Sequence, residues 1–144
     1  MQSFILILTL LAPRQLAVQV EVPPPVERGL NALREGRPDS AVIEWTRTWR
    51  SPDDSQKREQ LVASLRGLAQ IAGAVRGYDI VRVIQLTPHL RRVYVLLLCD
   101  IQPAYVMLVA YRPANEWTIT AVNWNTDVDK VFPTSLVGQE RPGT

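Results

Sequence analysis

Two kinds of hydrophobic periodicity divide the chain into two halves. In the first half, between residues 26 and 72, apolar residues recur every three or four positions, as Val26, Leu30 and Leu33 do. After Gly77 the period shortens towards two, and β-branched and aromatic residues become frequent. Because a period near 3.6 is typical of an amphipathic helix and alternation is typical of a half-buried strand, the pattern predicts helices followed by strands.

Three helices are predicted, and each has a recognisable start or stop. The first runs from about Val26 to a stop at Gly36, and the second follows Asp39, which is a good N-cap residue. The third begins in residues 51–54, where a capping Ser precedes a Pro and two acids, and it ends near Ala72. All three are amphipathic, so each should bury one stripe of its surface.

Four strands are predicted after the helices, joined by short turns that contain proline. They cover residues 78–86, 92–100, 104–112 and 116–124. The middle two are apolar on both faces, which favours central positions with cover on each side. The chain should therefore have an α+β fold with N-terminal helices packed on a curved four-stranded antiparallel meander sheet. Because the helices can cover only one face, we expect the C-terminal tail, a second copy or a partner to meet the other.

The N-terminus begins with an apolar run, residues 4–12, which has the length of a signal-peptide core and is too short to span a bilayer. We therefore predict a signal peptide over residues 1–19 and a Pro-rich linker over 20–25. The α+β domain follows over 26–133, and residues 134–144 form a flexible tail. This organisation predicts export to the periplasm or the exterior. The apolar run has two alternative interpretations. It could be an uncleaved segment that tethers the protein to the membrane, or the first helix or strand of the mature domain.

Composition bounds the chemistry of the chain. Its 144 residues suffice for one core, and the formal net charge of +2 is not a nucleic-acid footprint, so no nucleic-acid partner is predicted. Cys99 is the single cysteine, which excludes an intrachain disulfide, and its apolar surroundings predict a buried, unreactive thiol. The sequence holds no cofactor motif, and we predict no cofactor.

Several polar groups interrupt otherwise apolar strands and are the candidates for catalysis. In a sheet curved around a cavity, Asp79 or Asp100 could act as a base and Tyr105 or Tyr111 as a hydrogen-bond donor. The favoured interpretation is that they are strand-end and edge residues, since burying an unpaired charge is costly. His89, the only histidine, lies in a predicted turn, where a solvated imidazole is the expected state.

Two further patterns contain residue types that are common in binding sites. Asn123, Asn125, Asp127 and Asp129 alternate in the manner of calcium ligands, but Lys130 occupies the position that needs glycine. A strand exit with Asx turns is favoured, and no metal site is predicted. Three of the four tryptophans are predicted to pack in the core: Trp45, Trp49 and Trp117. The candidates for contact with a ligand or a partner are Trp124, Tyr105, Tyr111 and Arg82.

The order of elements over residues 26–133 resembles the cystatin-like folds, including the nuclear-transport-factor-like or SnoaL-like superfamily, and small exported bacterial proteins with this fold. The segments that carry the resemblance are 77–82, 92–95, 110–113 and 116–120. The resemblance implies a cone-shaped pocket between sheet and helices and dimerisation through the sheet. It leaves function open, because the superfamily includes binding domains, assembly domains and a few enzymes such as ketosteroid isomerase.

Three functions follow as hypotheses. The leading one is a non-enzymatic exported domain that binds a protein partner or a small apolar ligand through its sheet face or its cone-shaped pocket. The second is an isomerase- or cyclase-like enzyme with an Asp base and a Tyr donor converging in the cone. The third is a homodimer with a structural or assembly role.

Overall fold

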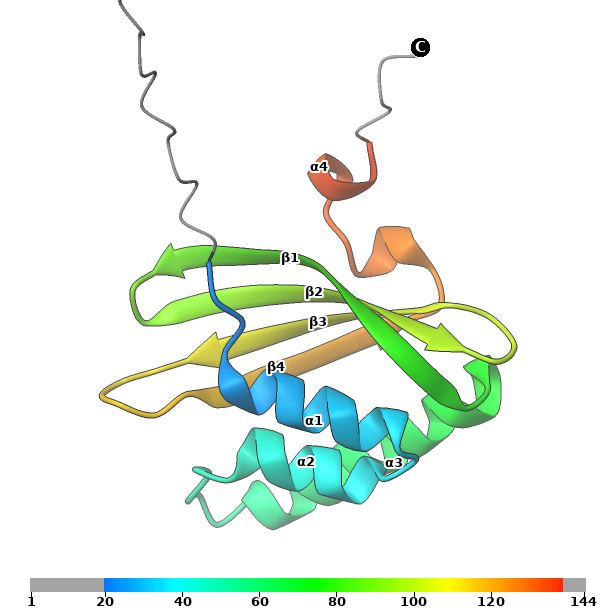
Figure 1. Ribbon diagram of the computed structural model, residues 1–144. Helices are drawn as coiled ribbons and strands as arrows, with labels where there is room; N and C mark the ends of the chain where they lie inside the picture. Colours follow the sequence, from blue (N-terminus) through cyan, green and yellow to red (C-terminus); the bar gives the residue numbers. More distant parts are fainter. Residues whose placement is uncertain (1–19, 139–144) are drawn as a thin grey trace, which may run out of the picture.

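The computed structural model describes residues 20–138, in which a layer of helices covers one face of an antiparallel sheet (Figure 1). The helices come first in the chain: α1 (Pro24–Arg34), α2 (Pro38–Thr46) and α3 (Asp54–Ala72). The strands follow in one sheet of order β1-β2-β3-β4: β1 (Val75–Thr87), β2 (Leu90–Cys99), β3 (Ala104–Tyr111) and β4 (Thr118–Asn125). The predicted α+β fold is confirmed, with β2 and β3 in the centre of the sheet.

Prolines begin two of the helices, and this corrects two boundaries. Pro24 and Pro25 lie in the first turn of α1, and Pro25 is buried, so the helix starts inside the segment predicted as a linker. Pro38 likewise opens α2, which places Asp39 in the first turn and not at the N-cap. A proline is tolerated there because its fixed φ suits the helix and the N–H that it lacks would have no intrahelical partner.

Glycines with positive φ follow two of the helices. Gly36 comes after α1 with φ 74°, and Gly73 follows α3 with φ 88°. Glycine adopts this left-handed region without the steric cost that a Cβ imposes. Gly73 is followed almost directly by β1, so the chain passes from the helical layer into the sheet within a few residues.

Alternate residues of the central strands face the helices and form the core. Val93, Val95 and Leu97 of β2 are fully buried, as are Val106 and Leu108 of β3. They pack with Leu30 and Val26 of α1, Trp45 of α2 and Leu68 of α3. The side chains between them along each strand point to the opposite face, because successive residues of a strand alternate.

The C-terminal segment crosses the sheet face that the helices leave uncovered. A 3₁₀ helix, η1 (Val128–Lys130), and a short helix, α4 (Thr134–Val137), lie on the far side of the sheet from α1–α3 (Figure 1). Residues 134–137, predicted to be flexible, are therefore helical. The predicted signal peptide, residues 1–19, lies outside the described residues. Within residues 20–138, no helix combines the length and the apolar character needed to cross a membrane.

Candidate functional site

The sheet face opposite the helices is the candidate site, and we call it the open face. Strand register brings its central side chains together: Arg82 pairs with Tyr94 and Tyr94 with Met107, while Ile84 pairs with Arg92. One row further along, Leu96 pairs with Tyr105. The open face thus places arginine, tyrosine, methionine and aliphatic side chains side by side.

The C-terminal segment covers the middle of the open face through one side chain. Phe132 is 7% exposed and packs edge-on against two tyrosines, with ring centroids 5.4 Å from Tyr94 and 5.3 Å from Tyr105. Tyr94 is buried beneath it. This geometry is favourable for aromatic pairs and holds the tail on the sheet. The sequence predicts the tail over residues 134–144 as the cover from the chain itself, but the side chain that meets this face, Phe132, lies just before it.

The cover is incomplete. Met107 and Val109 of β3 and Leu96 of β2 stay partly accessible beside Phe132. At opposite ends of the open face, Leu98 is 44% exposed and Tyr111 is 41% exposed. Apolar surface thus extends beyond both sides of the C-terminal segment.

The four catalytic candidates do not meet in a cavity. Asp79 is exposed on β1 and Tyr105 lies on β3, so strand β2 runs between them. Asp100 is exposed beyond the end of β2 and pairs with Arg76, whose Nη2 lies 2.8 Å from the carboxylate. That hydrogen bond, aided by the positive charge, lowers the pKa of Asp100. Tyr111 lies at the other end of the sheet, so the convergence that an isomerase requires is not present in this arrangement of the four side chains.

Two hollows border the layer between the helices and the sheet. A hollow of about 180 Å³ lies between α2, α3 and β4, with Trp45, Trp49 and Ile119 among its walls. This volume is below the roughly 300 Å³ at which small-molecule pockets begin. A hollow of about 580 Å³ lies at the other end of the helical layer, where Arg66 of the rim already pairs with Asp39. That second hollow exceeds this size, so of the two only this end of the cone has room for a small ligand.

The tryptophans mostly bind the two layers together. Trp45 is fully buried, and the indole nitrogen of Trp49 donates to the carbonyl of Ile119 in β4 at 2.9 Å. Trp124, predicted to contact a ligand or a partner, packs against the core and donates from Nε1 to Ser64 Oγ of α3 at 2.8 Å. It lies on the helix-facing side of the sheet, away from the open face.

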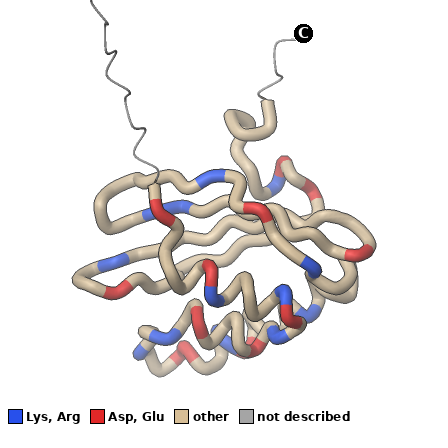
Figure 2. The backbone as a smooth tube through the Cα atoms, viewed as in Figure 1, with Lys and Arg blue, Asp and Glu red and all other residues tan. Residues whose placement is uncertain are grey.

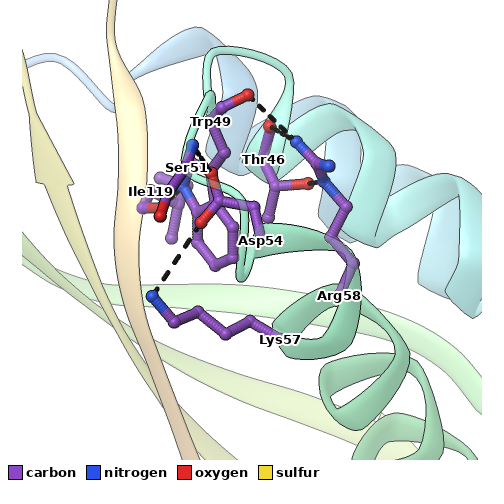
Figure 3. A network of polar contacts seen from close by, with 7 residues as sticks. All are labelled: Thr46, Trp49, Ser51, Asp54, Lys57, Arg58 and Ile119. Carbon is purple, nitrogen blue, oxygen red and sulfur yellow. Dashed lines mark hydrogen bonds and ion pairs between the residues drawn. The ribbon is translucent and has the colours of Figure 1, made fainter.

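A polar network around the α2–α3 connection, which sequence reasoning missed, is shown in Figure 3. Arg58 donates to Thr46 Oγ1 at 2.9 Å and to the carbonyls of Thr46 and Trp49 at 3.0 and 3.2 Å. Asp54 is 6% exposed and accepts from the backbone N–H of Ser51 at 2.5 Å. Ser51, predicted to cap this helix, lies before the N-cap residue Asp53, and α3 begins at Asp54 with no side-chain capping bond. The groups satisfy one another, so the network fixes the connection and is not a catalytic centre.

Cys99 is half-buried where a buried thiol was predicted, and the residues after β4 form the predicted Asx turns. Burial raises the pKa of the half-buried Cys99 thiol, and the negative charge of Asp100 raises it further, so the reactive thiolate is disfavoured. Asn125 Oδ1 accepts from the N–H of Asp127, and Asp127 Oδ1 from that of Asp129, which are Asx turns. Residues 20–138 contain no group of three or more His, Cys, Asp or Glu side chains placed to hold a metal ion.

Comparison with protein-family models, curated proteins and solved structures finds no match to this chain.

Proposed function

We propose that this chain is an exported, non-enzymatic domain that binds a protein partner through the open face of its sheet. The observation that carries the proposal is the apolar surface of Leu96, Met107 and Val109, which the C-terminal segment leaves partly accessible. Contiguous apolar surface on an exposed face is a common feature of interaction sites.

The side-chain chemistry of the open face favours a protein over a small ligand. Tyrosine, methionine and arginine are enriched in protein interfaces, whereas lysine and the acids are depleted. Here Tyr105, Met107 and Arg82 lie close together on the open face, and Asp79 is the acid among its central rows. For the alternative, a small apolar ligand held in the cone, the hollow beneath Trp45 is too small, and the larger hollow is rimmed by charged side chains such as Glu35, Arg66 and Arg76.

The cystatin-like assignment and the export of the chain belong to the same proposal. The order of elements, three helices and then a four-stranded meander, supports the first, and the apolar run over residues 4–12 supports the second. A homodimer that buries two open faces against each other is the competing role.

Site-specific photo-crosslinking in producing cells tests the proposal. Leu98→p-benzoylphenylalanine places the probe on the open face, where Leu98 is 44% exposed, and Ile43→p-benzoylphenylalanine places it on the outer face of α2, where Ile43 is 60% exposed. We expect the Leu98 probe alone to give a discrete adduct heavier than the chain by the mass of another protein.

Adduct formation should also depend on the centre of the open face. A second substitution, Val109→Asp, should abolish the adduct by placing a charge in an apolar contact. An adduct of twice the chain mass would replace the proposal with the homodimer. Equal adducts from both probes, or none from Leu98, would contradict it.

A further inference from the structure

Three arginines gather at one end of the sheet, where the β1–β2 hairpin meets the β3–β4 connection (Figure 2). Arg91 and Arg92 begin β2, and Arg112 follows β3 directly. The backbone N–H of Arg112 donates to the carbonyl of His89 in the hairpin at 2.8 Å, which ties the two connections together. We call Arg91, Arg92 and Arg112 the basic end.

The stems of these arginines are packed in place. The guanidinium carbons of Arg91 and Arg112 both lie 4.7 Å from the ring centroid of Trp117, within the range of cation–π attraction. The Nε atoms of Arg91, Arg92 and Arg112 are all buried. Each side chain is partly exposed, so its stem is held against the protein while charge remains at the surface.

The three arginines of the basic end form no ion pair among the described residues, although two acids, Glu21 and Glu116, lie at the same end of the sheet. Ion pairs elsewhere in residues 20–138 engage Arg28, Arg66 and Arg76, whereas none involves the three arginines of the basic end. Their contacts are with backbone oxygens: Arg91 Nη1 donates to the carbonyl of Glu21 at 2.7 Å, and Arg112 Nη2 to that of Pro88 at 3.4 Å. Since each guanidinium carries five N–H donors, most remain free for an anionic partner.

Large apolar side chains accompany these charges. Leu86, just before the hairpin turn, is 49% exposed, and Tyr111, adjacent to Arg112, is 41% exposed. Arginines interleaved with exposed aromatic and aliphatic side chains suit the interface of a bilayer, where charged headgroups overlie acyl chains.

The path of the chain indicates which anionic partner can reach the basic end. Arg91 holds the backbone at Glu21 through its hydrogen bond to that carbonyl. Pro13, which directly follows the apolar run over residues 4–12, lies eight positions before Glu21. Eight residues span at most about 29 Å when fully extended. In the tethered form of the protein, in which the apolar run is not cleaved, a bilayer that holds this run lies within reach of the basic end, whereas a nucleic acid has no such connection to it.

The geometry points to a membrane-contact surface: the basic end binds the phosphate headgroups of an anionic bilayer, with Leu86 and Tyr111 at the level of the headgroups. This contact shares Arg92 and Tyr111 with one end of the open face, whereas the proposed protein partner contacts the centre of that face at Leu96, Met107 and Val109. Lipid contact orients the domain so that the hairpin end faces the lipid and the centre of the open face stays available to a protein.

Vesicle sedimentation of the full chain tests the contact. Vesicles of phosphatidylcholine alone are compared with an equal mixture of phosphatidylcholine and phosphatidylglycerol, at low and high salt. On the mixed vesicles, R91Q/R92Q/R112Q should lower the partition coefficient about 100-fold at low salt, since each arginine near an anionic surface adds about a fivefold gain. The difference should shrink at high salt.

Two matched variants separate the basic end from net charge and from folding. R34Q/R37Q/R66Q removes the same charge at the α1–α2 turn and from α3, and it should bind within about twofold of the unchanged chain. R91K/R92K/R112K retains the charge and should bind within about threefold. The apolar N-terminal run is identical in every variant, so its contribution to binding cancels. Circular dichroism confirms that each variant is folded.

Four results would overturn the inference. The first is equal binding by R91Q/R92Q/R112Q and the unchanged chain. The second is an equal loss in R34Q/R37Q/R66Q, which would mean that net charge alone matters. The third is full competition by inorganic phosphate at constant ionic strength, which would indicate a site for the free ion. The fourth is displacement of the vesicles by a single-stranded oligonucleotide, which would assign the basic end to nucleic acid.

Discussion

Gly29 of α1 lies against the indole of Trp45 in α2, with no room between them for a methyl group. A Cβ at Gly29 would overlap with Nε1 and Cε2 of that indole, whose nitrogen points at the carbonyl of Val26. Gly67 of α3 is the opposite case, because nothing lies within 4 Å of the position of its Cβ. Both glycines weaken their helices by propensity, but the first allows two helices to approach closely.

Alanine substitutions at these two glycines should therefore have opposite signs. Gly29→Ala should lower the free energy of unfolding by about 1–3 kcal/mol, because the added methyl forces Trp45 from its site. Gly67→Ala should raise it by about 0.5–1 kcal/mol through helix propensity. Urea denaturation of the two variants measures both changes. A stabilising Gly29→Ala would show that α1 and α2 are not packed as described.

The element that most affects the open face is the C-terminal segment, and one side chain holds it there. Phe132 buries its ring between Tyr94 and Tyr105, while the neighbouring Val137 of α4 is 42% exposed. The segment from η1 to α4 contributes no other large buried side chain among the described residues. Its attachment therefore depends on a single aromatic cluster.

Phe132→Ala should detach this segment. We expect the free energy of unfolding to fall by about 3 kcal/mol, the usual cost of deleting a buried phenylalanine. Amide hydrogen exchange should rise in residues 126–137 and in the middle of β2, as Tyr94 loses its cover. Val137→Ala is the control and should change stability by less than about 0.5 kcal/mol. Unchanged exchange in Phe132→Ala would show that other contacts hold the segment.

At the scale of the whole molecule, helices and sheet share one core. Buried residues from α1, α2, α3 and all four strands form one contiguous cluster. Polar contacts join the same layers, since Trp49 reaches Ile119 in β4 and Tyr78 Oη in β1 lies 3.2 Å from Asn31 Oδ1 in α1. Neither layer can lose its partner without exposing that core.

Unfolding should accordingly be a single cooperative transition. Tryptophan fluorescence, which reports tertiary packing around Trp45 and Trp124, and far-UV circular dichroism, which reports helices and strands, should give the same urea midpoint. The matched comparison is between the two probes on one sample. Separate midpoints would mean that the helical layer and the sheet unfold independently.

Much of the architecture was readable from local patterns, because periodicity, prolines and glycines act through neighbouring residues. The predicted strand of residues 104–112 differs from β3 by one residue, and α3 ends at Ala72 as predicted. The boundary errors at Pro24 and Pro38 arose because a proline in the first turn of a helix and a proline in a linker look alike in sequence.

Only the tertiary structure decided which side chains meet. The apolar residues on both faces of β2 indicated two covered faces, but no local signal showed that Phe132, more than thirty residues later, covers Tyr94. The same holds for Arg91, Arg112 and Trp117, which chain folding brings together. Sequence by itself determined the elements and their order, since these depend on local conformation. Contacts between distant residues depend on how the sheet twists and where its connections end. The tertiary structure therefore decided which side chains form the open face and the basic end.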